Sequence, residues 1–369
     1  MTIQKDAPES FYEQIKQRIF KRVNSGEYRA EEKIPSEREL CKHYSVSRTT
    51  IRKAIDELVA EGVLIRRSGR GTFVADNLPK VKKKTDNILF LRCVHSDISR
   101  STSEIKDDIF YPKVLAGVEI AASKNNYHCL YKIINENDFN EEELEKSINN
   151  SDGIVCAEVH NYSFLKHLRK FSESVVLVCS SINDAEFDMV EIDNLKGSIE
   201  AVNYLIDNGH RDIAFIGGSE KSCASTEREE GYLQTLKKRG KKINPSFILS
   251  YGWRLEDGYN AVMDLLKQNT LPTAIFAASD LLAIGAINAI KDSGYSIPED
   301  ISVIGFDDIE MAGQVKPSLT TMRVRRAEMG EIAAKLMFER VNSQRDYPVR
   351  IAVPTVLQKR NSVKEVVEK

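Results

Sequence analysis

The residues best suited to reading DNA gather near the N-terminus of this 369-residue chain. Ser47-Arg48-Thr49-Thr50 opens a predicted helix after a short turn at Ser45-Val46. The first turn of a helix presents free backbone N–H groups and the positive end of the helix dipole, which favour a phosphate. In the major groove, arginine can donate two hydrogen bonds to guanine, and threonine can contact a phosphate or a thymine methyl. The pattern predicts a DNA-recognition helix.

The surrounding sequence supplies the elements that would hold this helix. Residues 9–25 carry apolar side chains at four-residue spacing and stop before Gly26, which predicts a first helix. The members of its apolar stripe are Phe11, Ile15, Ile19 and Val23. Ser36 and Glu39 have the spacing of a capping box, so a second helix should begin there and end near Tyr44. Ser47 should cap the third helix, and its core positions are Ile51, Ile55 and Leu58.

A hairpin completes this N-terminal unit. Two short predicted strands flank the turn Ser68-Gly69-Arg70-Gly71, which is typical of the wing of a winged helix–turn–helix. Arg70 at the tip of the wing suits the narrow minor groove, and Arg38 on the second helix can reach the edge of the same groove. Exposed arginines alone would fit an ordinary solvated helix pair equally well. The capping box, recognition face and glycine wing at consistent spacing favour DNA binding.

The rest of the chain predicts a second kind of fold. Residues 77–86 hold Pro79 and a run of lysines without apolar periodicity, which indicates an exposed linker. From residue 87 onward, continuous apolar strands alternate with amphipathic helices, the pattern of a doubly wound parallel α/β fold. The length is too great for one such sheet. We therefore predict two lobes divided near residue 190, with the final segment crossing back, and domains at 1–76 and 87–369.

Polar residues at the ends of predicted strands indicate a ligand site in this body. Ligands of open parallel sheets bind beyond the carboxyl ends of the strands. Asp307 ends one apolar strand and Ser279-Asp280 ends another, so these side chains should meet a cleft between the lobes. A carboxylate accepts two hydrogen bonds from vicinal hydroxyls, which suits a polyhydroxylated ligand. Asp280 could instead cap the next helix. Glu158, at the end of the strand near residue 155, is a further candidate.

Composition and charge restrict the function further. Residues 1–84 hold 19 Lys and Arg against 12 Asp and Glu, whereas the remainder holds 34 against 43, so only the N-terminal unit is suited to a polyanion. No apolar run reaches the roughly 18–20 residues that span a bilayer, and residues 1–10 lack the core of a signal peptide. The six cysteines show no CxxC spacing. These features predict a cytoplasmic protein without membrane association, disulfides, metal or cofactor.

Two stretches resemble known families. Residues 34–75, IPSERELCKHYSVSRTTIRKAIDELVAEGVLIRRSGRGTFVA, are similar to the winged helix–turn–helix of the GntR family. Residues 193–218 and 279–308, with LTTMRVRRAEMG and LQKRNS, resemble the sensor core of the LacI family. The combination resembles the arabinose-repressor branch. The DNA contacts implied by the GntR resemblance are Arg38, Arg48, Thr49, Thr50, Arg52 and Gly69. The effector contacts implied by the LacI resemblance include Arg228, Trp253 and Tyr111, while Ser279 stands where that family commonly has Asn.

Together these observations predict a homodimeric repressor that binds operator DNA and is released by a small sugar-type effector. Closure of the cleft around the ligand would change the spacing of the two DNA-binding heads. A co-repressor mode with a nucleobase or a partner protein stays open. An aminotransferase-like enzyme body is disfavoured, because no catalytic motif and no Schiff-base lysine context is found. A sugar-binding component outside the cell conflicts with the basic head.

Overall fold

The computed structural model describes residues 11–24, 26–76, 84–94, 108–182, 186–219, 222–268, 270–342, 345 and 347–366. Two compact units divide the chain between Lys83 and Lys84. Residues 77–83 of the predicted linker lie outside the described residues. Thr85 and Asp86, also predicted as linker, belong to the second unit, because both donate backbone N–H groups to the carboxylate of Asp152, at 2.8 and 3.0 Å. We call the first unit the head and the second the body.

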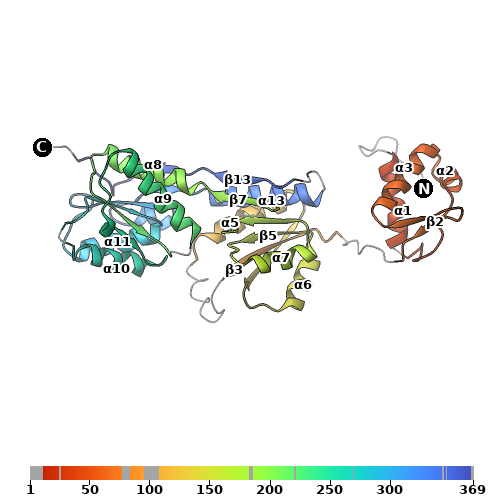
Figure 1. Cartoon of the computed structure of the whole chain (residues 1–369), viewed down its shortest axis with the longest axis horizontal. Helices are drawn as coiled ribbons and strands as arrows, with labels where there is room; N and C mark the ends of the chain where they lie inside the picture. The colour runs from red at the N-terminus through yellow and green to blue at the C-terminus, as the bar shows by residue number, and fades with distance from the viewer. Residues whose placement is uncertain are drawn as a thin grey trace. The chain divides into compact units, whose positions relative to one another are not determined.

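The head has three helices and a hairpin (Figure 1). Its elements are α1 (Phe11–Asn24), α2 (Glu37–Tyr44), α3 (Arg48–Ala60), β1 (Leu64–Arg67) and β2 (Gly71–Val74). The predicted capping box of α2 is present: Glu39 N–H donates to Ser36 Oγ at 3.3 Å, and Ser36 N–H donates to Glu39 Oε2 at 2.8 Å. Ser47 caps α3 through the N–H of Thr50.

The core of the head confirms the predicted helical faces, with one exception. The fully buried positions include Ile15, Ile19, Ile51, Ile55 and Leu58, as the periodicity predicts. Phe11 was expected in the stripe of α1, but it is 43% exposed. The helix begins at this residue, so Phe11 lies at its end, outside the layer of α3 and the hairpin that covers the later turns.

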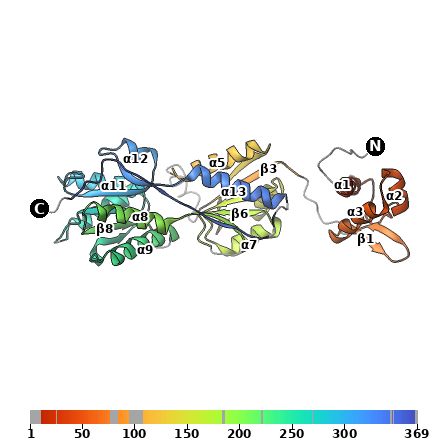
Figure 2. The same cartoon turned by 90° about the horizontal axis from the view of Figure 1, so that it is seen from above.

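The body contains two parallel sheets of six strands. The first lobe has the order β13-β7-β6-β5-β3-β4. Its strands are β3 (Asn87–Val94), β4 (His128–Asn135), β5 (Gly153–Ala157), β6 (Val175–Val178), β7 (Asp188–Ile192) and β13 (Arg350–Val353). Its helices are α5 (Tyr111–Lys124), α6 (Glu141–Asn149), α7 (Tyr162–Phe171) and α13 (Arg326–Val341). In Figure 2, α13 lies beside α5.

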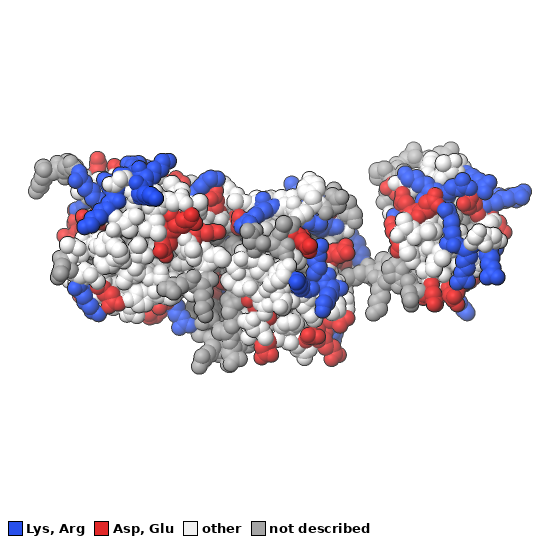
Figure 3. Space-filling view, viewed as in Figure 1, with Lys and Arg blue, Asp and Glu red and all other residues white. Residues whose placement is uncertain are grey.

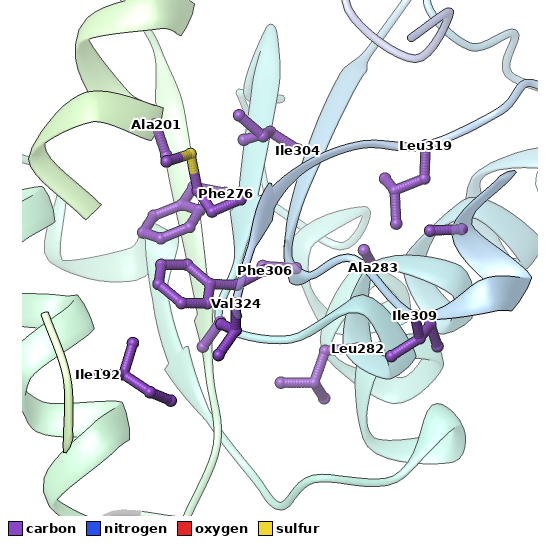
Figure 4. Packing of buried hydrophobic residues seen from close by; sticks show 14 of the residues in the cluster. Ile192, Ala201, Phe276, Leu282, Ala283, Ile304, Phe306, Ile309, Leu319 and Val324 are labelled. Atoms are coloured by element: carbon purple, nitrogen blue, oxygen red, sulfur yellow. The ribbon is translucent and has the colours of Figure 1, made fainter. Parts of the chain in front are cut away.

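The second lobe has the order β14-β12-β11-β10-β8-β9, in which only β14 runs antiparallel to its neighbour. Its strands are β8 (Ile213–Gly217), β9 (Ile248–Ser250), β10 (Ala274–Ala277), β11 (Ser302–Asp307), β12 (Thr320–Arg323) and β14 (Val356–Gln358). Its helices are α8 (Asn194–Asp207), α9 (Cys223–Lys238), α10 (Leu255–Leu265), α11 (Asp280–Asp292) and α12 (Glu310–Gln314). Its buried face packs Phe276, Phe306 and Val324 closely (Figure 4).

The connections between the lobes determine where a ligand can bind. The chain leaves the first lobe after β7, returns to it at α13, and leaves again between β13 and β14. The predicted division near residue 190 agrees with this arrangement, but the chain crosses three times. One crossing back was expected because the short strands β12, β13 and β14 did not stand out in the sequence. In each lobe, the carboxyl ends of the central strands lie at the edge that carries the polar candidates.

Candidate functional site

The recognition helix α3 presents its polar residues to solvent. The Arg48 and Arg52 side chains are 73% and 55% exposed. Thr49 is exposed as well, and the hydroxyl of Thr50 is held 2.7 Å from that of Ser47 at the capped end of the helix. The opposite face of α3 is buried in the head. One helix therefore has an apolar face that is buried in the head and a basic face that is exposed, the arrangement that major-groove recognition requires.

A single carboxylate organises this basic face. Glu37 Oε2 lies 3.0 Å from Arg48 Nε and 3.4 Å from Arg52 Nη2, while Glu37 Oε1 lies 3.8 Å from Arg66 Nη2 of β1. The hydrogen bond from Arg48 is the main cause that holds the pKa of Glu37 below its ordinary value. Neither Glu37 nor Arg66 was singled out in the sequence. Their contact connects the recognition helix with the hairpin, so the arginines form one surface.

The hairpin has the geometry that a wing needs. Gly69 has φ +66° and Gly71 has φ +114°, values that other residues rarely adopt. A Cβ atom on Gly71 would lie 2.6 Å from Cε of Lys33. A Cβ atom on Gly69 would have no other atom within 4 Å. Arg70 between them and Arg38 on α2 are exposed. Figure 3 shows Lys and Arg side chains gathered on the visible face of the head.

In the second lobe, Asp307 and Arg228 come together as predicted. Asp307 ends β11 with φ +115°, and its Oδ1 lies 3.7 Å from Nη1 of Arg228 on α9. Arg228 is 3% exposed. Its Nε donates to Asn194 Oδ1 at 2.9 Å, and its guanidinium carbon lies 3.8 Å from the Phe306 ring centre. Burial raises the pKa of Asp307 to about 6, against the opposing effect of Arg228. At 3.7 Å the two side chains do not satisfy each other's hydrogen-bonding capacity, so both can still hydrogen-bond to a ligand.

The other second-lobe candidates divide into two kinds. Trp253 is half-buried and packs against Gly218, with its ring centre 5.9 Å from the Arg228 guanidinium, so it can cover one side of a ligand. Asp280 is fully buried and accepts hydrogen bonds from Ile309 N–H and the Thr321 hydroxyl, at 2.8 and 2.5 Å. Ser279, rather than Asp280, caps α11. Asp280 therefore holds the loop after Asp307 in place. Its two carboxylate oxygens are already hydrogen-bonded within the protein and do not face a ligand.

The first lobe contributes a second charged cluster. Arg92, at the carboxyl end of β3, forms ion pairs with Asp108 and Glu158, and its guanidinium lies 3.7 Å from the ring centre of Tyr111. Tyr111 and Glu158 were predicted, whereas Arg92 and Asp108 were not. An arginine inside an otherwise apolar strand was the available signal. Asp108 also accepts the N–H groups of Phe110 and Tyr111, which fixes the start of α5 beside the cluster.

Cys179 connects the two clusters. It follows β6 with φ +51°, and burial raises the pKa of its thiol to about 12, so the thiol is neutral. After burial, the carboxylates of Glu158 and Asp307 also raise the pKa of this thiol, and the guanidinium groups of Arg228 and Arg92 lower it, so charged groups of both lobes lie near Cys179. Predicted residues of both lobes are therefore found near Cys179, namely Glu158 of the first lobe and Arg228 and Asp307 of the second, whereas Asp280 is fully buried. Within the described part of the chain, no group of His, Cys, Asp and Glu side chains could hold a metal ion.

This combination of a basic recognition helix with a two-lobed cleft defines a ligand-responsive DNA-binding protein. Residues 11–74 match the family of bacterial regulatory proteins of the gntR type, and residues 202–363 match the periplasmic binding protein-like domain. The HTH-type transcriptional repressor PurR of Pasteurella multocida is 36% identical over 216 residues, 58% of this chain and 64% of that protein. The chain thus spans less than two thirds of this relative. No helix among the described residues is long and apolar enough to cross a membrane.

Other matches cover more of the chain. The repressor CytR of Escherichia coli is 31% identical over 265 residues, 69% of this chain and 76% of that protein. The arabinose metabolism repressor of Geobacillus stearothermophilus is 28% identical over 96% of this chain and 98% of its own length. The solved complex of the regulator CelR with cellobiose is 25% identical, with a TM-score of 0.67 over 86% of this chain and 91% of that one. The chain belongs to the LacI family of transcription regulators, which are not enzymes, and carries a GntR-type head.

Proposed function

We propose that this protein is a repressor of carbohydrate-utilisation genes that leaves its operator when a small sugar binds between the lobes of the body. The observation that carries the proposal is the presence of two charged clusters near Cys179, Arg228 with Asp307 in the second lobe and Arg92 with Glu158 in the first. A sugar offers hydroxyls that donate to carboxylates and accept from guanidinium groups. The CelR complex with cellobiose and the arabinose repressor support the same ligand class by relationship.

On the DNA side, we propose that Arg48 and Arg52 read bases and that Thr49 and Thr50 contact the backbone. Ser47 would present the N-terminus of α3 to a phosphate, and Arg38, Gly69 and Arg70 would contact the duplex from α2 and the wing. These positions are exposed or at the capped end of α3. Because such a protein acts on chromosomal DNA, we place it in the cytoplasm.

We also propose that the active species is a homodimer. One recognition helix covers too few base pairs for specific binding, whereas a two-fold dimer reads two half-sites. The first lobe offers an apolar surface for this contact. Ile120 of α5 is exposed, as is Tyr131 on the edge strand β4, whose ring lies on the same face of the sheet as Phe90 and α5. Sedimentation of the full chain, compared with a Tyr131→Glu variant, tests this surface: the wild type should be dimeric and the variant should dissociate more readily.

The alternative is a co-repressor mode, in which a nucleobase or a partner protein strengthens operator binding. A thermal-shift screen of the full chain against pentoses, hexoses, disaccharides and nucleobases distinguishes the two ligand classes. A ligand at about 100 times its dissociation constant adds about 2.7 kcal/mol to stability. Operator DNA selected from a random library then shows the direction of the response. A sugar that weakens operator binding supports our proposal, and a nucleobase that strengthens it refutes it.

A further inference from the structure

A cavity lies at the junction of the lobes, and neither Cys179 nor Arg228 is among its lining residues. It has a volume of about 400 Å³ and is lined by both lobes. Lys113 of α5 and the first turn of α13 come from the first lobe, while Asp308, Arg323 and Arg360 come from the second. Such a volume is within the range of about 300–1,000 Å³ that small-molecule sites occupy. We call it the junction pocket.

The decisive feature of the junction pocket is the guanidinium of Arg326. This residue is 4% exposed, yet no carboxylate among the described residues lies within ion-pair distance of it. Its Nη1 donates to the carbonyl of Ile109 in the first lobe and its Nη2 to the carbonyl of Asp308 in the second, both at 3.0 Å. Its Nε has no partner. A buried cation is normally paired with an anion. Arg326 acts on the carboxylate of Asp307, whose pKa it lowers, only from beyond ion-pair distance, so its charge is partly compensated.

The surroundings add positive charge. Arg326 is the first residue of the 16-residue helix α13, whose N-cap residue provides no side-chain hydrogen bond, so the positive end of the helix dipole is uncapped. Asp308 is shared between two arginines: its Oδ2 lies 2.8 Å from Arg323 Nε, and its Oδ1 pairs with Arg360 Nη2. Lys113 has one exposed partner, Glu310, at 3.1 Å. The lining also includes the carboxylates of Glu310 and Glu328, so four cationic side chains stand against three carboxylates, an excess of one positive charge.

We propose that the junction pocket binds a small phosphate monoester, as a second ligand site distinct from the effector cleft. A phosphate accepts paired hydrogen bonds from guanidinium groups and suits a helix N-terminus. The pocket is larger than free phosphate requires, which leaves space for a body of a few carbon atoms. The cations that would contact the phosphate are Arg323, Arg360 and Lys113, while Arg326 supplies buried charge behind them.

The two sites are neighbours on a single turn of the chain. Asp307 and Asp308 both have positive φ, 115° and 55°. Asp307 faces Arg228 in the cleft, whereas Asp308 faces Arg323 and Arg360 in the junction pocket. A phosphate that contacts Lys113 from one lobe and Arg323 from the other would favour one spacing of the lobes. The pocket would thereby bias the same opening and closing that the cleft ligand controls.

The test is calorimetric titration of the full chain with glycerol 3-phosphate at constant ionic strength, with inorganic phosphate and glycerol as comparison ligands. We expect glycerol 3-phosphate to bind more tightly than phosphate, and glycerol not to bind. Arg323→Gln and Lys113→Gln should each weaken binding at least tenfold. Lys335→Gln removes an exposed charge further along α13 and should leave binding unchanged. Circular dichroism verifies that each variant is folded.

Three results would overturn the proposal. The first is no binding of glycerol 3-phosphate at millimolar concentration. The second is equal weakening by all three substitutions, which would indicate general attraction of anions. The third is binding that survives Arg323→Gln and Lys113→Gln but is lost in Arg228→Gln, which would place the phosphate in the effector cleft. This test is independent of the proposed sugar effector, because the titration contains neither a sugar nor DNA.

Discussion

The head and the cleft use arginine in opposite ways. In the head, Arg48 and Arg52 extend into solvent and share the carboxylate of Glu37. In the cleft, Arg228 and Arg92 are largely buried: Arg92 pairs with Asp108 and Glu158, and Arg228 is held by Asn194 and the carbonyl of Ala278, with Asp307 nearby. Exposed guanidinium groups remain free for a polyanion and are screened by salt. Buried and paired ones offer directed hydrogen bonds instead. The comparison predicts that the head is sensitive to ionic strength and the cleft to substitution and pH.

The largest effect is expected from Arg228→Met in the cleft. The substitution removes the donors of the clamp and leaves the buried carboxylate of Asp307 without its cation, a loss of about 2–5 kcal/mol in comparable buried pairs. Effector affinity should fall at least about 100-fold, while operator binding without effector is unchanged because the head is a separate unit. Lys238→Gln, an exposed change on the same helix, is the control. Wild-type effector affinity in Arg228→Met would contradict the cleft assignment.

The next effect concerns the recognition helix. Arg48→Ala and Arg52→Ala should each weaken operator binding by about 1–3 kcal/mol, or roughly 5- to 150-fold, and relax specificity at one base pair. Electrophoretic mobility shifts at two salt concentrations measure both affinity and salt dependence. Lys21→Ala removes an exposed cation of α1 and serves as the control. Undiminished affinity in both arginine variants would show that α3 does not read the DNA.

The same contrast explains what the sequence could predict. In the head, function depends on local rules: Ser36 with Glu39 and Ser47 with Thr50 identify helix starts, and the periodicity of Ile51, Ile55 and Leu58 identifies the buried face. The remaining positions of each helix are then predicted to lie at the surface. In the body, the alternation of strands and helices predicted the doubly wound sheets, and strand ends predicted Asp307. Phe11 shows the limit, because its exposure depends on where a helix begins.

The unpredicted residues of the body depend on tertiary contacts. Arg92 lies in a strand pattern that is otherwise apolar, and its partners Asp108 and Glu158 are distant from it in the chain. Asp280 looked like a helix cap, but its oxygens bind Ile309 and Thr321, which only the packed sheet brings to it. Arg326 touches carbonyls of both lobes. Sequence patterns over a few neighbouring residues cannot predict contacts between segments that are distant in the chain. The charge network of the cleft could therefore be identified only from the structure.

A smaller effect tests the titration of the cleft. Burial raises the pKa of Asp307 to about 6, so the carboxylate is ionised at pH 7 and largely protonated at pH 5. The ionised form accepts more hydrogen bonds from hydroxyls. Effector affinity should therefore decrease about tenfold from pH 7 to pH 5, and Asp307→Asn should abolish this dependence. Titration at a series of pH values measures it. A flat wild-type profile would mean that the bound ligand does not use the carboxylate.

The smallest effect concerns Glu37, which holds the arginines of the head in place but also opposes DNA binding. Its carboxylate pairs with Arg48, Arg52 and Arg66, and DNA must compete for the same groups. Partly exposed ion pairs contribute about 0.2–1 kcal/mol, so Glu37→Gln should strengthen binding to non-specific DNA by roughly 1.5- to 5-fold. The added positive charge should also steepen the salt dependence.

Glu57→Gln is the matched control, since Glu57 lies on α3 but pairs with Lys16 of α1. Fluorescence anisotropy with operator and random duplexes separates the two roles of Glu37. If the carboxylate mainly restrains the arginines, Glu37→Gln raises random-duplex affinity and lowers the ratio of operator to random binding. If it mainly positions them, operator affinity falls while random binding is constant. The second result would show that the exposed arginines of the head need a fixed geometry to bind DNA, as the buried arginines of the cleft do to bind a ligand. The head and the cleft would then differ only in how far their arginines are buried.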